Sequence, residues 1–292
     1  MKKSTLALSL VAGLAPATQA QLIPAPFAIG GEHQFAADID DSGEFSRSAA
    51  RFRVSAPLHF TDDYFVGLTA GGVWEHFEFD DTLVNPWEDV YRPQVAVVSK
   101  GTLANGWTWL AIPWVAADAE DGADWGEALT YGGMGAAWTE VSDSLTLGAG
   151  LGVRSQLEDD VQVFPILVID WKICPDLTFS TLPPEGFRVG PAASLRWDAR
   201  DDLALSLVYS YQSDRHRLAE NSDAAPDGIG QFRQHRIALA ATHQFHENLS
   251  LTGHLGYTFG GELEVEDSDG DQLDSRDFDG SLVLGLEGSW RF

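Results

Sequence analysis

The sequence predicts an all-β protein, a single antiparallel transmembrane β-barrel of about fourteen strands, with twelve to sixteen possible. Three observations predict it. The chain starts with a segment typical of exported proteins, apolar and polar residues then alternate at every second position, and short turns alternate with longer acidic loops. An even number of antiparallel strands joined in this way is typical of bacterial outer-membrane barrels.

Residues 1–20, MKKSTLALSLVAGLAPATQA, have the three parts of a secretory signal peptide. Lys2 and Lys3 precede an apolar run from Leu6 to Leu14, and small residues lead to a cleavage site before Gln21, or after Ala17 if Ala15-Pro16-Ala17 is the site used. A membrane anchor is the alternative, but the apolar run is shorter than the ~18 residues that span a bilayer. We therefore expect Sec export, removal of residues 1–20, and a barrel domain formed by residues 21–292.

The composition narrows the class of partner. The chain has 44 acidic and 18 basic residues and a net charge of −26, so it repels nucleic acid, and we expect no nucleic-acid partner. A hydrophobic content of 44% with 11% aromatic residues indicates a folded chain rather than a disordered acidic one. The single cysteine, Cys174, excludes an intramolecular disulfide and a thiolate metal cage.

Two kinds of break separate the candidate strands, and they alternate along the chain. Six tight turns lie at 61–63, 104–106, 142–143, 174–176, 200–202 and 246–248. Seven mostly longer, acidic loops lie around 38–44, 75–89, 118–127, 158–160, 183–186, 214–230 and 262–279. Apolar or aromatic residues follow each tight turn, as in the interfacial girdle of a membrane protein. This order predicts short periplasmic turns, longer acidic external loops, and both termini on the periplasmic side.

The strands between these breaks carry one apolar and one polar face. The alternation is clearest in 51–59, 145–154, 188–198, 203–212, 249–259 and 282–292. A soluble sandwich would show the same pattern, but the signal peptide and the alternating breaks favour a barrel whose apolar face meets lipid. The strand at 161–173 is apolar on both faces, so its inner side must meet other side chains, for example those of an inward loop.

The arginines of the strands fall on the polar face. We therefore predict that these arginines line the lumen, together with one acid of the last strand. The predicted lumen-lining residues are Arg51, Arg53, Arg154, Arg188, Arg196, Arg291 and Glu287. Basic and acidic groups that face one another across a lumen select ions in channels. In the alternative, the arginines pair with inward acids such as Glu287, Asp170 and Asp198 and fill a closed interior.

The mature sequence resembles an uncharacterised, porin-like family of bacterial outer-membrane β-barrels that carries a domain-of-unknown-function label. The resemblance is strongest within residues 161–190, which contain VFPILVIDWKICPDLTFSTLPPEGFRVG, and in YSYQSDRHRL at 209–218. Trp290 and the terminal Phe292 also resemble the C-terminal signal that the barrel-assembly machinery reads, although Gly288 is offset by one place from the usual glycine. The resemblance implies a fold and an outer-membrane location, and it implies no activity.

Two motifs raise the question of chemistry. Asp267, Asp269, Asp271 and Asp274 alternate as in the first half of an EF-hand loop, but Gln272 replaces the required glycine and Phe278 the final acid. We therefore expect no specific metal site, and at most loosely bound divalent cations. No nucleophile elbow of the form G-x-S-x-G is present. An outer-membrane hydrolase would need a serine and a histidine within hydrogen-bond reach at the outer rim.

These observations favour a passive channel for small solutes or hydrophobic compounds in the outer membrane of a Gram-negative-type cell, in contact with its lipids. We expect no enzyme activity and no cofactor. The alternative is a plugged structural or surface-binding barrel that acts through its acidic loops, and a hydrolase is the least favoured class.

Overall fold

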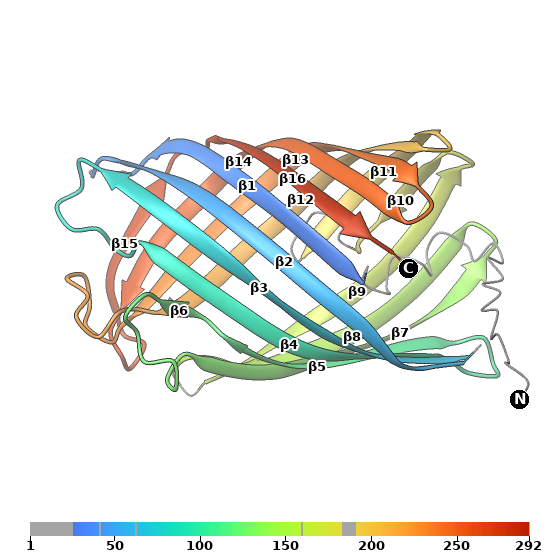
Figure 1. Cartoon of the computed structure of the whole chain (residues 1–292), viewed down its shortest axis with the longest axis horizontal. Coiled ribbons are helices and arrows are strands. Elements are labelled where there is room, and N and C mark those ends of the chain that lie inside the picture. Colours follow the sequence, from blue (N-terminus) through green and yellow to red (C-terminus); the bar gives the residue numbers. More distant parts are fainter. Residues whose placement is uncertain (1–25, 41, 62, 159, 183–190, 292) are drawn as a thin grey trace, which may run out of the picture.

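The computed structural model describes residues 26–40, 42–61, 63–158, 160–182 and 191–291, and these residues form a closed barrel (Figure 1). The prediction of a single, all-β, antiparallel barrel of fourteen strands is confirmed. The strands of the wall are β1 (Phe27–Asp38), β2 (Glu44–Phe60), β3 (Tyr64–Asp80), β4 (Asp89–Thr102), β5 (Thr108–Ala117), β7 (Leu129–Ser142), β8 (Leu145–Ser155), β9 (Val161–Cys174), β10 (Leu177–Ser180), β11 (Ala192–Arg200), β12 (Leu203–Arg217), β13 (Ile229–His246), β14 (Leu249–Glu266) and β16 (Leu282–Trp290).

Two additional strands, β6 (Ala119–Glu120) and β15 (Gln272–Phe278), lie within the longer loops. Each wall strand pairs with its neighbours in chain order, and the last strand, β16, pairs with β1 over eight residues. This pairing closes the sheet, so no long free edge is left to associate with other chains. The predicted signal peptide at 1–20 and the terminal Phe292 lie outside the described residues.

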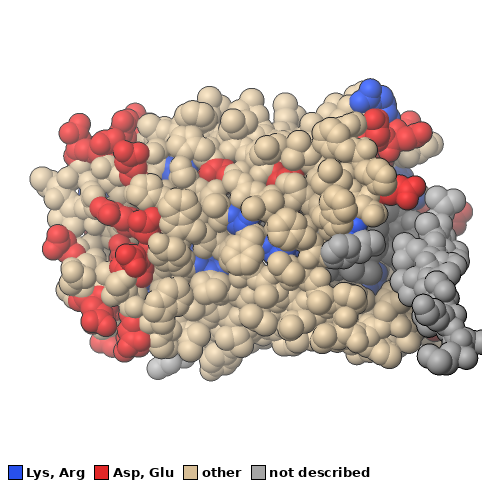
Figure 2. Space-filling model, viewed as in Figure 1, with Lys and Arg blue, Asp and Glu red and all other residues tan. Residues whose placement is uncertain are grey.

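The two ends of the barrel differ as the alternation of breaks predicts. The six tight turns lie at one end, here called the turn end, together with the C-terminal end of β16. The longer connections lie at the other end, the loop end, where Figure 2 shows a rim of acidic side chains. Three of the predicted loops, at 75–89, 214–230 and 262–279, are shorter in the structure, because β3 continues to Asp80, β12 to Arg217 and β14 to Glu266.

The outer face of the barrel is apolar. On β8, for example, Leu147, Leu151 and Val153 are exposed, while Gly152 is buried on the inner face. Most of the other strands repeat this pattern, with polar outward residues on β1–β4 near the loop end, so the backbone pairing lies within the wall and most of the outside presents hydrocarbon. This combination is what a lipid bilayer requires of a spanning β-structure. Among the described residues, no helix is long and apolar enough to cross a membrane.

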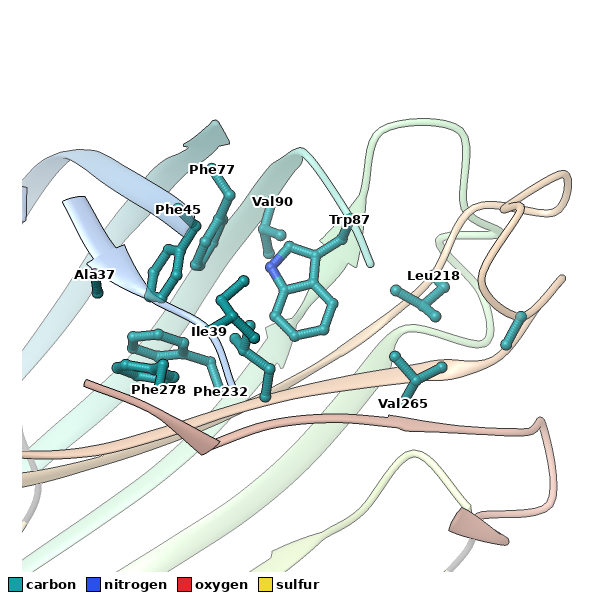
Figure 3. Close-up of a cluster of buried hydrophobic side chains, with 12 residues drawn as sticks. Ala37, Ile39, Phe45, Phe77, Trp87, Val90, Leu218, Phe232, Val265 and Phe278 are labelled. Carbon is teal, nitrogen blue, oxygen red and sulfur yellow. The ribbon is translucent and has the colours of Figure 1, made fainter. Parts of the chain in front are cut away.

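The largest core cluster lies inside the barrel at its loop end (Figure 3). Phe45 of β2 and Phe232 of β13 contact Phe278 of β15, and Phe77 of β3 contacts Phe232. The ring centroids of Phe45 and Phe278 are 4.8 Å apart with the edge of one ring against the other. Trp87, from the loop between β3 and β4, covers Phe77 at 5.7 Å. Edge-to-face contacts of this kind favour one definite arrangement of the rings.

Removal of one ring from this cluster should weaken the whole barrel. We expect Phe77→Ala to lower the free energy of unfolding by ~3–5 kcal/mol, because the substitution leaves a cavity among rings that cannot close around it. Urea titration of the refolded protein in detergent measures the change. As the control, Phe60→Ala removes a ring that is 69% exposed at the turn end and should change the value by only about 0.5 kcal/mol. Equal effects of the two substitutions would contradict the assignment of the cluster as the core.

Candidate functional site

The interior of the barrel divides into a filled half and an open half. The filled half comprises the eight strands β12, β13, β14, β16, β1, β2, β3 and β4, whose inward polar side chains are mostly buried. The open half comprises the six strands β5 and β7–β11, on which the inward side chains of Gln162 and Arg196 remain partly exposed, whereas others, such as Trp138 and Asp170, are buried. Gln94 of β4 is also exposed and lies at the border between the two halves. The accessible part of the lumen therefore lies along the open half.

Glu32 of β1 is the centre of a buried ion network in the filled half. Its carboxylate lies 2.7 Å from the Arg47 guanidinium on β2 and 2.6 Å from that of Arg236 on β13. The Nε2 atom of His254 on β14 lies 3.2 Å from the same carboxylate. All four side chains are at least nine-tenths buried. Because each charge has close opposite partners, the network offsets the large cost of removing carboxylates and guanidinium groups from water.

Arg92 of β4 extends this network across the barrel. Its guanidinium lies 3.1 Å from Glu75 of β3 and 2.7 Å from Asp214 of β12, and Glu75 in turn lies 3.5 Å from Arg47. Six wall strands separate β4 from β12 in either direction around the barrel. The Arg92–Asp214 contact, here called the cross-barrel brace, therefore joins opposite walls and narrows the lumen at this level.

The short strand β6 closes the same gap nearer to the loop end. It pairs with β4 through Val90 and Tyr91, and with β12 through Arg217. The carboxylate of Glu120 accepts hydrogen bonds from the backbone N–H of Glu88 at 3.0 Å and of Ala219 at 2.9 Å, so it joins the β3–β4 loop to the β12–β13 loop. Burial raises the pKa of the Glu120 carboxyl group.

A further connection crosses the loop end from the β8–β9 loop. Arg215 of β12 donates a hydrogen bond to the side-chain oxygen of Gln156 at 3.0 Å and forms ion pairs with Glu158 and Glu266. The neighbouring Arg217 donates to the backbone oxygen of Leu157 at 2.9 Å. Loops from both halves of the barrel therefore converge on β12, and they restrict access to the lumen from the loop end.

The wall of the open half carries apolar side chains that lie flat. The Phe164 ring of β9 covers Gly152 of β8 so closely that a Cβ atom on Gly152 would lie 2.0 Å from it, and the Trp114 ring of β5 covers Gly132 of β7 in the same way. Glycine at these places lets large rings lie along the wall instead of across the lumen. The result is an apolar surface on one side of the lumen, opposite the charged filled half.

The strand at 161–173 has the predicted apolar inner face. Among the described residues, this face contacts side chains of neighbouring strands, and no inward loop contacts it. Val168 of β9 belongs to a buried cluster with Trp138 of β7, Leu110 of β5 and Val98 of β4. Gly148 of β8, which pairs with both Trp138 and Val168, leaves the space for this contact. The second apolar face of β9 is therefore part of the wall of the open half.

The structure places the predicted lumen residues in different surroundings. Arg51 forms an ion pair with Glu287 at 2.8 Å, and both lie on the inner face of the filled half. Arg53 follows two residues later on the same face. In the open half, Arg154 donates to Gln162 at 2.8 Å and Arg196 pairs with Asp198 at 2.8 Å.

The other predicted positions lie at the ends of the barrel. Arg291 follows β16 at the turn end, where its backbone N–H bonds to the oxygen of Asn248, and Arg188 is outside the described residues. Trp290 points outward at the turn end and is 41% exposed. Its recognition by the assembly machinery, with Phe292, stays a prediction. Asp267 caps the β14–β15 hairpin by accepting N–H bonds from Asp269 and Asp271, and no group of three or more potential metal ligands occurs among the described residues. Asp274 belongs to β15.

Sequence reasoning missed the residues that build the network. Glu75, Asp214 and Arg92 lie in segments that were predicted as, or bordered on, acidic loops, although β3, β4 and β12 run through them. Arg47 belongs to the same alternating series as Arg51 and Arg53 on β2, so a longer strand assignment would have included it. The signal was the period of two, which continues into the acidic segments.

Comparison with known proteins finds likeness in structure only. No family model matches the chain, and no curated protein matches it. Similar solved structures include an outer membrane channel from Pseudomonas putida F1, with a TM-score of 0.49, 11% identity, and 96% of this chain and 100% of that chain covered. A Pseudomonas aeruginosa FadL homologue has a TM-score of 0.47 and 11% identity, with 94% of this chain and 96% of that chain covered. The Pseudomonas putida toluene transporter TodX has a TM-score of 0.39 and 10% identity, with 94% of each chain covered.

The cross-barrel brace should carry a large share of the stability. We expect Arg92→Met to lower the free energy of unfolding by ~3–5 kcal/mol, because it leaves the buried Glu75 and the partly buried Asp214 without their shared cation. Adding Asp214→Asn should restore part of the loss, which a double-mutant cycle in urea measures. The control is Arg200→Met, which breaks the exposed Arg200–Asp202 pair and should cost about 1 kcal/mol or less. Strictly additive effects at 92 and 214 would contradict a direct brace.

The raised pKa of Glu120 predicts a definite pH dependence. The contribution of a carboxyl group with a raised pKa in the folded state is complete at low pH and is lost as pH rises above its ordinary value of about 4.5. We therefore expect the wild-type protein to lose stability relative to Glu120→Gln as pH rises from 4 to 8 (about the range in which carboxyl groups with raised pKa values ionise). Urea midpoints measured at several pH values test this. An opposite slope would show that the two backbone hydrogen bonds outweigh burial.

Proposed function

We propose that this protein is an outer-membrane channel through which small, largely apolar compounds pass down their concentration gradient. The route is the open half of the lumen, along β5 and β7–β11. The observation that carries the proposal is the inner wall of this half, where Phe164 and Trp114 lie close against Gly152 and Gly132 and Gln162 beside them is exposed.

The outer-membrane location rests on the barrel itself. An even-numbered, closed antiparallel barrel with an apolar exterior is the spanning structure of that membrane. The acidic rim of the loop end would face the outside of the cell and the turn end the periplasm (Figure 2). Sec export through residues 1–20 is part of the proposal.

The physical basis of selection is the contrast between the two sides of the lumen. On one side, the wall presents Phe164, Trp114 and Ile166, which favour apolar solutes that shed little water. On the other side, charges are already paired with one another, as in Arg51–Glu287, and attract ions weakly. Arg154 and the Arg196–Asp198 pair are partly exposed in the open half and would set a modest ion preference.

A second candidate is a plugged barrel that binds partners or divalent ions through its acidic loops. The observation in its favour is the interlocked loop end, where Glu120, Arg215 and Arg217 join loops from both halves. Under this reading the open half is a cavity that is reached from the turn end only, and no solute crosses.

A pair of adjacent substitutions on β4 separates the two candidates. Gln94 points into the lumen and is exposed, and Val95 points into lipid and is 49% exposed. We expect Gln94→Trp to reduce single-channel conductance in planar bilayers strongly, and to slow uptake of a small aromatic compound into proteoliposomes, because the indole fills the open half. Val95→Trp adds the same ring on the lipid side and should leave both unchanged.

The contrary outcome is equally specific. Heat-dependent mobility in gels verifies that the wild-type protein is folded. If the folded protein neither conducts ions nor admits the aromatic compound, the channel is excluded and the plugged barrel is favoured. Equal conductance of the wild type and both variants would show that the route does not follow the open half.

A further inference from the structure

A row of four polar residues crosses the outer, lipid-facing surface of β1–β4 near the loop end. His33 of β1 lies opposite Ser48 of β2, Ser48 lies opposite His76 of β3, and His76 lies opposite Asp89 of β4. Side chains of directly opposite residues in neighbouring strands share one face and are about 5 Å apart at their Cβ atoms. The row lies beside the outward aromatic residues Phe35 and Trp74, which are 46% and 40% exposed. Aromatic residues at this place mark the interface between lipid tails and head groups.

Hydrogen bonds order both ends of this row. The Ser48 hydroxyl group and the Nδ1 atom of His33 are 3.0 Å apart, and the His33 ring is held by the edge of Phe35 at 4.8 Å between centroids. On the other side of Ser48, the Nδ1 atom of His76 is 3.1 Å from an Asp89 oxygen, which also accepts the Trp74 indole N–H at 2.8 Å. Ser48 therefore has an imidazole hydrogen-bonded on one side and a second imidazole, paired with an acid, on the other.

An apolar groove leads to this row along the outer wall. The groove has a volume of about 1020 Å³, and the residues that line it include His33, Gly31, Gly253, Leu255, Leu284 and Leu286. Gly31 and Gly253 contribute no side chain to its lining, and the leucines make the lining apolar. In a bilayer, lipid tails surround these strands, so an acyl chain is the occupant that the position and chemistry of the groove fit. The histidine at one end of the groove would then lie beside the polar part of the same molecule.

We propose that Ser48 and His33 form a catalytic pair that hydrolyses acyl esters of membrane amphiphiles whose chain lies in this groove. A serine hydroxyl is a weak nucleophile unless a neighbouring base accepts its proton, and the His33 ring is within hydrogen-bond distance to do so. Polar residues are ordinary at the level of lipid head groups. The combination of a serine–histidine hydrogen bond with a chain-sized groove beside it is what favours a site.

The reaction consumes one water molecule and no other co-reactant. The Ser48 oxygen bonds to the ester carbonyl carbon while its proton passes to His33; the bond to the alcohol then breaks, and the alcohol leaves with that proton. Ser48 is now acylated. Water attacks the acyl carbon, gives a proton to His33, and the carboxylic acid departs as Ser48 recovers the proton. His76, positioned by Asp89, lies where it can contact the polar head group of the substrate.

The test uses the full-length mature protein, folded in phospholipid vesicles, with a fluorophosphonate probe that labels activated serines. We expect labelling of the wild type and release of fatty acid from the vesicle lipid, measured by mass spectrometry. Ser48→Ala should abolish both. The control is Ser46→Ala, two residues away on the same face and opposite Glu78, which should retain both.

Substitution of the base gives a second, independent readout. We expect His33→Gln to lower the labelling rate by ~10²-fold or more, the usual contribution of a general base, and to do so without a change in heat-dependent gel mobility. Absence of labelling in folded wild type, or labelling that persists in Ser48→Ala, would overturn the proposal. Because the row lies on the outer face, neither result bears on conductance through the lumen, so this proposal and the channel fail separately.

Discussion

The interior of this barrel depends on one contact, the ion pair between Arg92 of β4 and Asp214 of β12. A barrel of fourteen strands encloses more space than inward side chains can fill, whereas about eight strands enclose just enough. By joining opposite walls, the cross-barrel brace separates an eight-stranded part, which side chains fill, from a six-stranded part, which they line. The aromatic cluster, the β6 strand and the converging loops are all arranged around this division.

The filled half is polar because its strands alternate, and the network is how the protein accommodates that polarity. An isolated buried charge would be prohibitively unfavourable, but the two most deeply buried carboxylates each have two arginine partners: Glu32 has Arg47 and Arg236, and Glu75 has Arg47 and Arg92. Such a network is satisfied in one arrangement of the strands only. The guanidinium of Arg47 also lies 5.3 Å from the centroid of the Phe232 ring, which joins the network to the aromatic cluster above it.

The inner and outer surfaces of the barrel wall are formed by alternate residues of the same strands, whose side chains point in opposite directions. On β2, Arg47 points inward into the network and the next residue, Ser48, points outward into the row beside the groove. The network fixes the register of β1, β2 and β3, and this register brings His33, Ser48 and His76 into line. The position of the outer row is thus a consequence of how the inside is braced, while its chemistry is independent of the lumen.

The sequence by itself determined the fold class, the strand number, the order of short and long connections, and which residues face lipid, because the period of two and the turn residues are local properties of the chain. It also placed Arg51 and Glu287 on one face. Their pairing was one of two alternatives that the sequence left open. The brace between Arg92 and Asp214 could not be predicted, since these residues are far apart in the chain and their strands extend into segments whose acidity resembles that of loops. The tertiary structure alone decided which half of the interior is filled, because that depends on contacts across a closed wall.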